Sequence, residues 1–231
     1  ISTKRLASLL QKAGNLVEVF VPQGSLQPGC TYSVQEGGVI VNRFGVQRRV
    51  DDTLADWFDM LIDRHANNPY DLVHGFYLVQ AGFMAAYAGN YLHIPSVVSA
   101  RGNDLDRSVF HPGKAAHVLY ALQQSTVITG NSKHLVRKAL ALAPGKTVEF
   151  IPNSVDGELF QPGKRDEELA QQLELGNSLV IGFSGEARIK KGLAIQLLAF
   201  EKVAAQRDVV FLMVGGVRSG EDQELLKVFQ K

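Results

Sequence analysis

The sequence of 231 residues has little of what would mark a secreted, membrane-spanning or nucleic-acid-binding protein. Its single cysteine, Cys30, excludes an intramolecular disulfide. Lys and Arg number 24 against 23 Asp and Glu, a net charge of +1 that gives no basic field to recruit nucleic acid. No apolar run approaches the roughly 20 residues that span a bilayer. These absences predict a cytoplasmic protein without a nucleic-acid partner.

Motifs for metal and dinucleotide chemistry are also missing. The six histidines lack a spacing such as H-E-x-x-H, so we predict no metal site. Gly215-Gly216 is not the G-x-G-x-x-G fingerprint, which disfavours a dinucleotide dehydrogenase. Cys30 follows Pro28-Gly29 in a loop, and we expect an incidental thiol rather than a nucleophile.

What the sequence does contain is an alternation of short apolar runs and amphipathic helical patterns. A run at 17–21, which Pro22 is expected to stop, begins the series. Such alternation predicts an α/β fold with βαβ units and a mostly parallel sheet. Ligands of such sheets bind at the carboxyl ends of the strands. The residues after each strand therefore draw attention, and Asn131 among them is expected to cap the helix that follows.

A change in local composition between Pro152 and Asn177 predicts a domain boundary. Loop signals, Pro152 to Gly157 and Gln161-Pro162-Gly163, precede a charged helical pattern at 164–175. We therefore predict a first domain at 1–155, a linker at 156–177, and a second unit at 178–231.

The stretch Leu179 to Leu193 concentrates positive charge where a strand gives way to a helix. A buried-strand pattern ends at Ser184-Gly185, and Arg188, Lys190 and Lys191 follow. A helix N-terminus presents free N–H groups and the positive end of its dipole, so added cations build a site for a phosphate or diphosphate. The alternative is a turn whose exposed lysines bind nothing, and the local pattern leaves both open.

Several segments in order resemble one family, the retaining GT-B glycosyltransferases related to glycogen and sucrose synthases (the family 4-like group). The resemblance covers nearly the whole chain, and the segments at Ile151–Asp156 (I-P-N-S-V-D) and Lys190–Gly192 (K-K-G) carry most of it. It implies two Rossmann-like domains, the first binding the acceptor and the second a nucleotide sugar. It also implies that the chain is an internal fragment, with the first strand and an acidic donor-binding segment outside it.

The resemblance implies a transferase of carbohydrate biosynthesis that moves a sugar from a nucleotide-diphosphate donor to a saccharide or glycolipid acceptor with retention. It implies no cofactor beyond the donor, and a fragment that is inactive alone. Lys4, Arg5 and Lys12 leave a weak peripheral membrane contact open.

Gly185, Arg188 and Lys191 would bind the donor diphosphate in this scheme. Lys191 matches the family's lysine before glycine, whereas Glu186 stands where the family usually has arginine. Arg188, two residues later, could supply that cation. Lys190 is expected to be solvated.

The first domain departs from the family as well. Arg101 stands where many members have a histidine near the reacting sugar, and arginine cannot act as a base near neutral pH. We predict catalytic roles for Arg101 and Asp104, with an ion pair or loop cap as the alternative. His74, Tyr77 and Asn103 are predicted on the acceptor side.

Two other functions compete with the glycosyltransferase. One is a nucleotide-sugar epimerase of the same fold, which would need carboxylates or histidines at the cleft. The other is a glycosyltransferase-like binding domain without turnover, which Glu186 keeps open.

Overall fold

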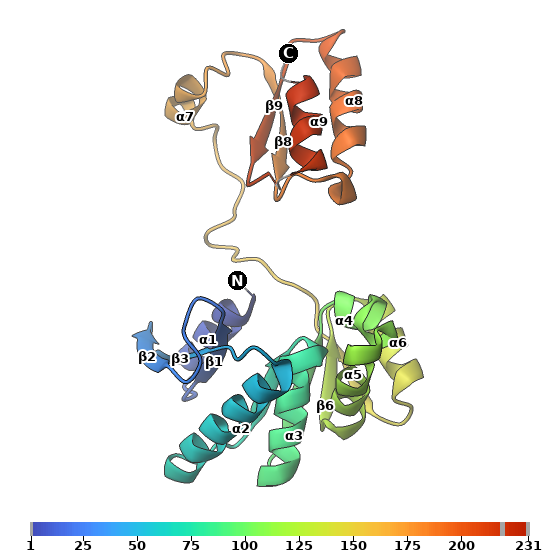
Figure 1. Cartoon of the computed structure of the whole chain (residues 1–231). Helices are drawn as coiled ribbons and strands as arrows, with labels where there is room; N and C mark the ends of the chain where they lie inside the picture. Colours follow the sequence, from blue (N-terminus) through green and yellow to red (C-terminus); the bar gives the residue numbers. More distant parts are fainter. Residues whose placement is uncertain (1, 218–219, 230–231) are drawn as a thin grey trace. The chain divides into compact units, whose positions relative to one another are not determined.

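The structure is a computed structural model that describes residues 2–217 and 220–229, and the chain forms two compact units (Figure 1). Unit 1 comprises residues 1–155 and unit 2 residues 156–231. The strands are β1 (Glu18–Gln23), β2 (Thr31–Glu36), β3 (Val39–Gly45), β4 (Val73–Phe76), β5 (Ser96–Ala100), β6 (Val127–Gly130) and β7 (Thr147–Phe150) in unit 1, and β8 (Leu179–Ser184) and β9 (Val209–Val214) in unit 2.

Helices alternate with these strands in both units. Unit 1 contains α1 (Ser2–Lys12), α2 (Val50–Asn67), α3 (Phe83–Leu92), α4 (Asn103–Asp106), α5 (Pro112–Gln124) and α6 (Lys133–Leu142), and unit 2 contains α7 (Glu167–Gln172), α8 (Leu193–Ala204) and α9 (Glu221–Phe229). Shorter helical segments are the π-helical η1 (Leu78–Gly82) and the 3₁₀ helices η2 (Ser108–Phe110) and η3 (Ile189–Lys191).

Unit 1 contains two sheets. Strands β4, β5, β6 and β7 lie side by side in that order, all parallel. The second sheet has the order β1-β3-β2, in which β1 and β3 are parallel and β2 and β3 form an antiparallel hairpin. The α/β class with parallel sheets is thereby confirmed. Within the described residues β1 and β4 are each the edge of a separate sheet, and a strand before residue 1 stays a prediction.

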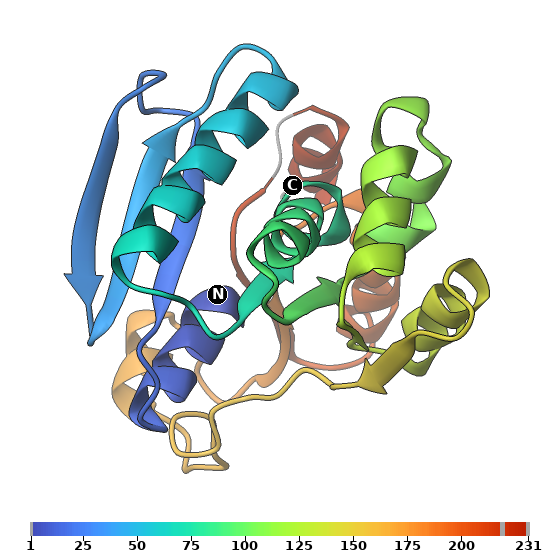
Figure 2. The same cartoon turned by 90° about the horizontal axis from the view of Figure 1, so that it is seen from below.

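The main core of unit 1 lies between one face of the β4–β7 sheet and the helices that cover it (Figure 2). Side chains alternate across a strand, so Val98, Ala100 and Ile128 point to the covered face and are at most 1% exposed. They pack against Val118 and Leu122 of α5. Ser99 and Thr129 lie on the opposite face of the same strands.

Gly75 lets the chain turn back closely over β4. A Cβ atom on Gly75 would lie 2.3 Å from the carbonyl oxygen of Ala81 in η1. Because no side chain tolerates that distance, glycine is required for η1 to pack on the strand. The segment after Tyr77 is π-helical up to Gly82, and α3 continues from Phe83.

Two local predictions for unit 1 are wrong. The strand predicted to stop at Pro22 runs on to Gln23. Proline is tolerated there because, among the strands that the structure describes, β1 pairs with β3 alone and lies at a sheet edge. The cap of α6 is Ser132, whose hydroxyl accepts from the Leu135 amide at 3.2 Å, and not Asn131.

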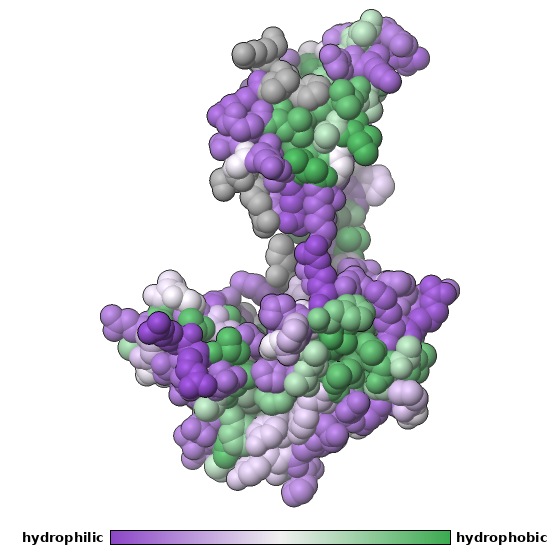
Figure 3. Space-filling model, turned by 45° about the vertical axis from the view of Figure 1, so that its right-hand side comes forward, coloured by the Kyte–Doolittle hydropathy of each residue, from purple (hydrophilic) through white to green (hydrophobic). Residues whose placement is uncertain are grey.

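Unit 2 is a parallel pair, β8 and β9, packed with α8 and α9. The charged helix predicted at 164–175 is shorter, because Asp166 caps it at its start and Glu174 adopts a left-handed φ of 53° just after it. Figure 3 shows a hydrophobic area on the surface of this unit, and α8 exposes Ile195 by 74% and Leu198 by 52%.

None of the helices in the described part of the chain is both long and apolar enough to cross a membrane.

Candidate functional site

The carboxyl ends of the parallel strands in unit 1 gather five of the predicted residues at one edge. His74 lies in β4 and Tyr77 directly after it, while Arg101, Asn103 and Asp104 follow β5. Gly185, Arg188 and Lys191 gather in the same way after β8 of unit 2. The predicted residues therefore form two groups, one in each unit.

Asp104 joins the two loops of the first group. It is 2% exposed, and its carboxylate accepts the backbone amides of Gly102 at 2.8 Å, Arg101 at 3.0 Å and Leu78 at 3.3 Å. A carboxylate with several amide donors is well stabilised in a buried place. This geometry gives Asp104 a part in holding the loops, and its catalytic role stays a prediction.

Tyr77 occupies a strained backbone position beside Asp104. Its φ is 67°, which a non-glycine residue rarely adopts, and its side chain is 57% exposed. Its amide donates to the Ser99 carbonyl at 3.1 Å, and its own carbonyl accepts from Gly82 at 2.7 Å. Such strain persists where surrounding bonds fix it, and it presents this ring to solvent at the strand end.

Arg101 is held from two sides. Its guanidinium carbon lies 5.5 Å from the ring centroid of Phe76, a cation–π distance. One of its terminal nitrogens donates to Oδ1 of Asn153 at 2.9 Å. Asn131 contributes its side-chain amide to the same oxygen at 3.5 Å. The loops after β5, β6 and β7 thus converge on Asn153.

His74 begins a chain of polar contacts across three strands. Its Nε2 lies 2.8 Å from the Ser99 hydroxyl, which lies 2.7 Å from the Thr129 hydroxyl. The His74 ring also stacks on Phe76, with 4.8 Å between centroids. His74 as a residue is exposed, yet its ring packs against these neighbours, and burial lowers the pKa of His74 to about 4. The ring is therefore neutral near neutral pH.

Four residues of this edge were not predicted as part of a site, although alternation could have indicated three. Phe76 is two residues from His74, and Ser99 and Thr129 share its sheet face by strand register. Asn153 follows β7, and its contact with Arg101 joins residues 52 positions apart. Asn103 is exposed in α4, as an acceptor contact requires.

The turn of unit 2 is fixed by backbone hydrogen bonds to the segment after β9. Gly185 N donates to Val214 O and Ala187 N to Gly216 O, each at 2.9 Å. A Cβ on Gly215 would lie 2.1 Å from the carbonyl oxygen of Gly185, so the close approach of these two loops needs glycine. Gly185 itself has a φ of 142°.

The cations lie directly after this crossing. Arg188 precedes η3, Lys191 ends it, and Gly192 in a left-handed conformation opens α8. Lys191 is exposed and Arg188 is half-buried, with one terminal nitrogen 3.1 Å from a Glu186 carboxylate oxygen. The positive end of the dipole of the twelve-residue α8 adds partial positive charge. The turn can therefore hold an anion with several oxygens.

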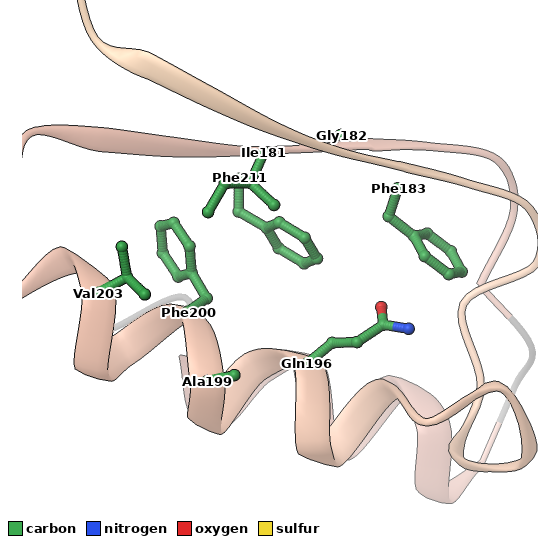
Figure 4. Close-up of a pocket in the computed structure, with 8 residues that line it drawn as sticks. All are labelled: Ile181, Gly182, Phe183, Gln196, Ala199, Phe200, Val203 and Phe211. Carbon is green, nitrogen blue, oxygen red and sulfur yellow. The ribbon is translucent and has the colours of Figure 1, made fainter.

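A cavity of about 330 Å³ adjoins this turn (Figure 4). The rings of Phe183, Phe200 and Phe211 line it from β8, α8 and β9, and the side chain of Gln196 projects into it. The amide nitrogen of Gln196 donates to Lys191 O at 3.1 Å, which braces the turn from inside. The oxygen of the same Gln196 side-chain amide, Oε1, is buried and makes no hydrogen bond in the described residues.

No group of three or more His, Cys, Asp or Glu side chains within residues 2–217 and 220–229 is placed to hold a metal ion.

Comparison with solved structures places this architecture among the GT-B glycosyltransferases. A structure from E. coli described as trehalose-6-phosphate bound with UDP-2-fluoro glucose aligns over 97% of this chain and 63% of its own, with a TM-score of 0.64 and 14% identity. HepE from Anabaena, in complex with UDP and glucose, aligns over 84% and 52%, with a TM-score of 0.64 and 21% identity. At these identities the likeness establishes the fold.

A third match is the α,α-trehalose-phosphate synthase (UDP-forming) from Burkholderia vietnamiensis, with a TM-score of 0.58 and 14% identity over 92% of this chain and 62% of its own. The chain thus spans between about half and two thirds of the length of these structures. A search of curated proteins gave no match.

The sequence itself identifies the family. Residues 1–159 match the model of Glycosyltransferase Family 4, so the chain belongs to that family. The resemblance seen in the sequence is thereby confirmed.

Proposed function

We propose that the whole protein that carries this chain transfers a sugar, with retention, from a nucleotide-diphosphate donor to a saccharide or glycolipid acceptor. The observation that carries the proposal is the cationic strand-to-helix turn of unit 2, where Arg188 and Lys191 lie at the start of α8. Family membership and solved structures with UDP, glucose or UDP-2-fluoro glucose support it.

The turn suits the leaving group of such a reaction. When the bond between sugar and diphosphate breaks, negative charge grows on the diphosphate oxygens. Fixed cations and helix N–H groups stabilise that charge in the transition state. Arginine can grip two oxygens at once, while lysine acts more as a point charge. We assign Arg188 and Lys191 these roles, with Gly185 letting the backbone approach. The reaction needs no further cofactor.

The edge of unit 1 supplies an acceptor side in this proposal. Tyr77 and Asn103 are exposed there, and Arg101 offers hydrogen-bond donors. Arg101 would bind the acceptor or a phosphate oxygen rather than remove a proton, since a guanidinium stays protonated. His74, neutral at pH 7, can exchange hydrogen bonds with a hydroxyl. Asp104 positions these loops.

Membrane contact through α1 gains little support. Lys4 bonds Glu36 at 2.8 Å, and Arg5 donates to the Ser154 carbonyl at 2.8 Å, so two of the three basic residues have contacts within unit 1. We propose a cytoplasmic location because nucleotide sugars as donors and an exposed, unpaired Cys30 both suit that compartment.

Titration calorimetry of UDP-glucose and a GDP-sugar against the whole protein tests the proposal. Lys191→Ala should weaken binding of the preferred donor about tenfold, because a charge-assisted contact is worth about 1.5 kcal/mol or more. Lys190→Ala is the matched control: it removes an adjacent exposed lysine of the same turn, and binding should stay within about twofold.

Equal donor affinity of the wild type and Lys191→Ala would show that the donor does not bind at this turn. Binding without transfer to any saccharide acceptor would favour the non-catalytic protein. Conversion of the donor sugar without an acceptor would favour the epimerase. Proton NMR of the new anomeric centre decides retention, and inversion would contradict that part of the proposal.

A further inference from the structure

An acidic side chain lies inside the cationic turn of unit 2. The Oε2 atom of Glu186 is 3.1 Å from a terminal nitrogen of Arg188, and their side chains are 40% and 25% exposed. Glu186 also stands where the resemblance leads one to expect an arginine. A carboxylate at a diphosphate site either competes with the ligand or serves the arginine beside it, and these two roles predict opposite effects of its removal.

The backbone explains why the two side chains meet. Ala187 pairs with the segment after β9 and is 2% exposed, with its side chain in the core of unit 2. Arg188 is extended, with φ −160° and ψ 156°. Because side chains alternate along an extended segment, Glu186 and Arg188 project on the side opposite to Ala187. Their contact is therefore built into the turn.

We propose that Glu186 is a positioning residue, which fixes the guanidinium of Arg188 for the donor diphosphate. The inference rests on the function proposed above. A free arginine side chain loses rotamer entropy when it is fixed. Because Glu186 already restrains the Arg188 side chain before the donor binds, less of this entropy is lost on binding, which is the effect of preorganisation. A guanidinium has five N–H donors, so a contact through one terminal nitrogen leaves others for phosphate oxygens.

The inner nitrogen of the Arg188 guanidinium is buried, while the side chain as a whole is 25% exposed. This Nε has no hydrogen-bond partner among the described residues. The outer nitrogens are therefore what a ligand can reach. On this account Glu186 and Arg188 together take the place of the single arginine of the family pattern. The cation comes two residues later in the sequence, and the Glu186 carboxylate holds its guanidinium at the site.

Two variants of Glu186 separate positioning from competition. Glu186→Gln keeps an oxygen that can accept from Arg188 but removes the negative charge. Glu186→Ala removes both. Calorimetric titration of UDP against the whole protein should give a loss of about five- to tenfold in affinity for Glu186→Ala, the size of one charge-assisted hydrogen bond. Glu186→Gln should stay within about threefold of the wild type.

A double-variant cycle supplies a readout that a purely structural role would not give. If Glu186 acts through Arg188, Glu186→Ala should weaken UDP binding little further once Arg188→Ala is present. Thermal melting of each variant establishes that unit 2 stays folded, and Glu186→Gln provides the comparison should Glu186→Ala melt early.

Tighter binding by both Glu186 variants would show that the carboxylate competes with phosphate and would overturn the proposal. Unchanged binding by Glu186→Ala would also overturn it. In both cases loss of binding in Arg188→Ala would leave the proposed function intact. If instead Arg188→Ala and Lys191→Ala bind UDP as the wild type does, the proposed donor site fails, and the role of Glu186 fails with it.

Discussion

The two groups of candidate residues are built by different means. In unit 1 the group is set by side chains: Asp104 is 2% exposed and ties two loops, and Arg101 is held between Phe76 and Asn153. In unit 2 the backbone sets the turn, through Gly185, Gly215 and the bonds to the segment after β9, and the charged side chains are more exposed. The first arrangement fixes shape, and the second presents charge.

The cores behind the two groups differ as well. In unit 1, Leu78, Val98 and Ile128 are fully buried. The described core of unit 2 centres on Ala187, Leu193 and Leu197. Each prediction below removes one of these supports.

Removal of the Asp104 carboxylate should have the largest effect. Asp104→Ala leaves the amides of Leu78, Arg101 and Gly102 without their acceptor in a buried place, so the free energy of unfolding of unit 1 should fall by about 3 kcal/mol or more. Fluorescence of Trp57, the only tryptophan and a core residue of unit 1, reports this in a urea titration.

Asp106 provides the matched control on the same short helix. It is 43% exposed and bonds Lys138 at 2.6 Å, so Asp106→Ala should cost no more than about 1 kcal/mol. Equal losses for the two variants would mean that the loops of unit 1 do not depend on the buried carboxylate.

The corresponding change in unit 2 is Gly215→Ala. The added methyl would lie 2.1 Å from the Gly185 carbonyl, at a φ of 141° that L residues avoid, so the two loops must separate at a cost of about 2 kcal/mol. Hydrogen exchange of the β8 and β9 amides should then accelerate. A Cβ on Gly216 has open space around it, and Gly216→Ala should change the exchange little. Similar exchange in both variants would contradict a turn fixed by close approach.

The sequence predicted the elements better than their contacts. The alternation of apolar runs and helical patterns predicted the α/β class, and the parallel sheets confirm it. The prediction failed at Pro22, where sheet order decides whether a proline is tolerated, and at 164–175, where Glu174 takes a left-handed conformation just after the helix. The first error depends on the order of strands that are far apart in the sequence, and the second on the conformation of a single residue.

The candidate site shows the same limit. Strand ends were predictable, so His74, Arg101 and Lys191 could be selected from position alone. The contact of Arg101 with Asn153 joins β5 and β7 loops, and the Glu186–Arg188 pair depends on which way Ala187 points. In the sequence Glu186 was notable only because the resemblance leads one to expect an arginine there. The structure shows that its carboxylate contacts Arg188.

The pH dependence of stability also sharpens the comparison, because all six histidines lie in unit 1. Burial lowers the pKa of His74 from 6.5 to about 4, so above about pH 6.5 the ring is neutral in both the folded and the unfolded chain. As the pH falls towards 4, the unfolded chain binds the proton first, and unit 1 loses stability. His74→Gln should flatten this part of the urea-midpoint profile of Trp57 fluorescence, since an amide can still bond Ser99 but does not titrate. An unchanged slope in the variant would assign the acid sensitivity elsewhere. Amide exchange of β8 and β9, in a unit without histidine, should show no such variant-dependent change between pH 6.5 and 4.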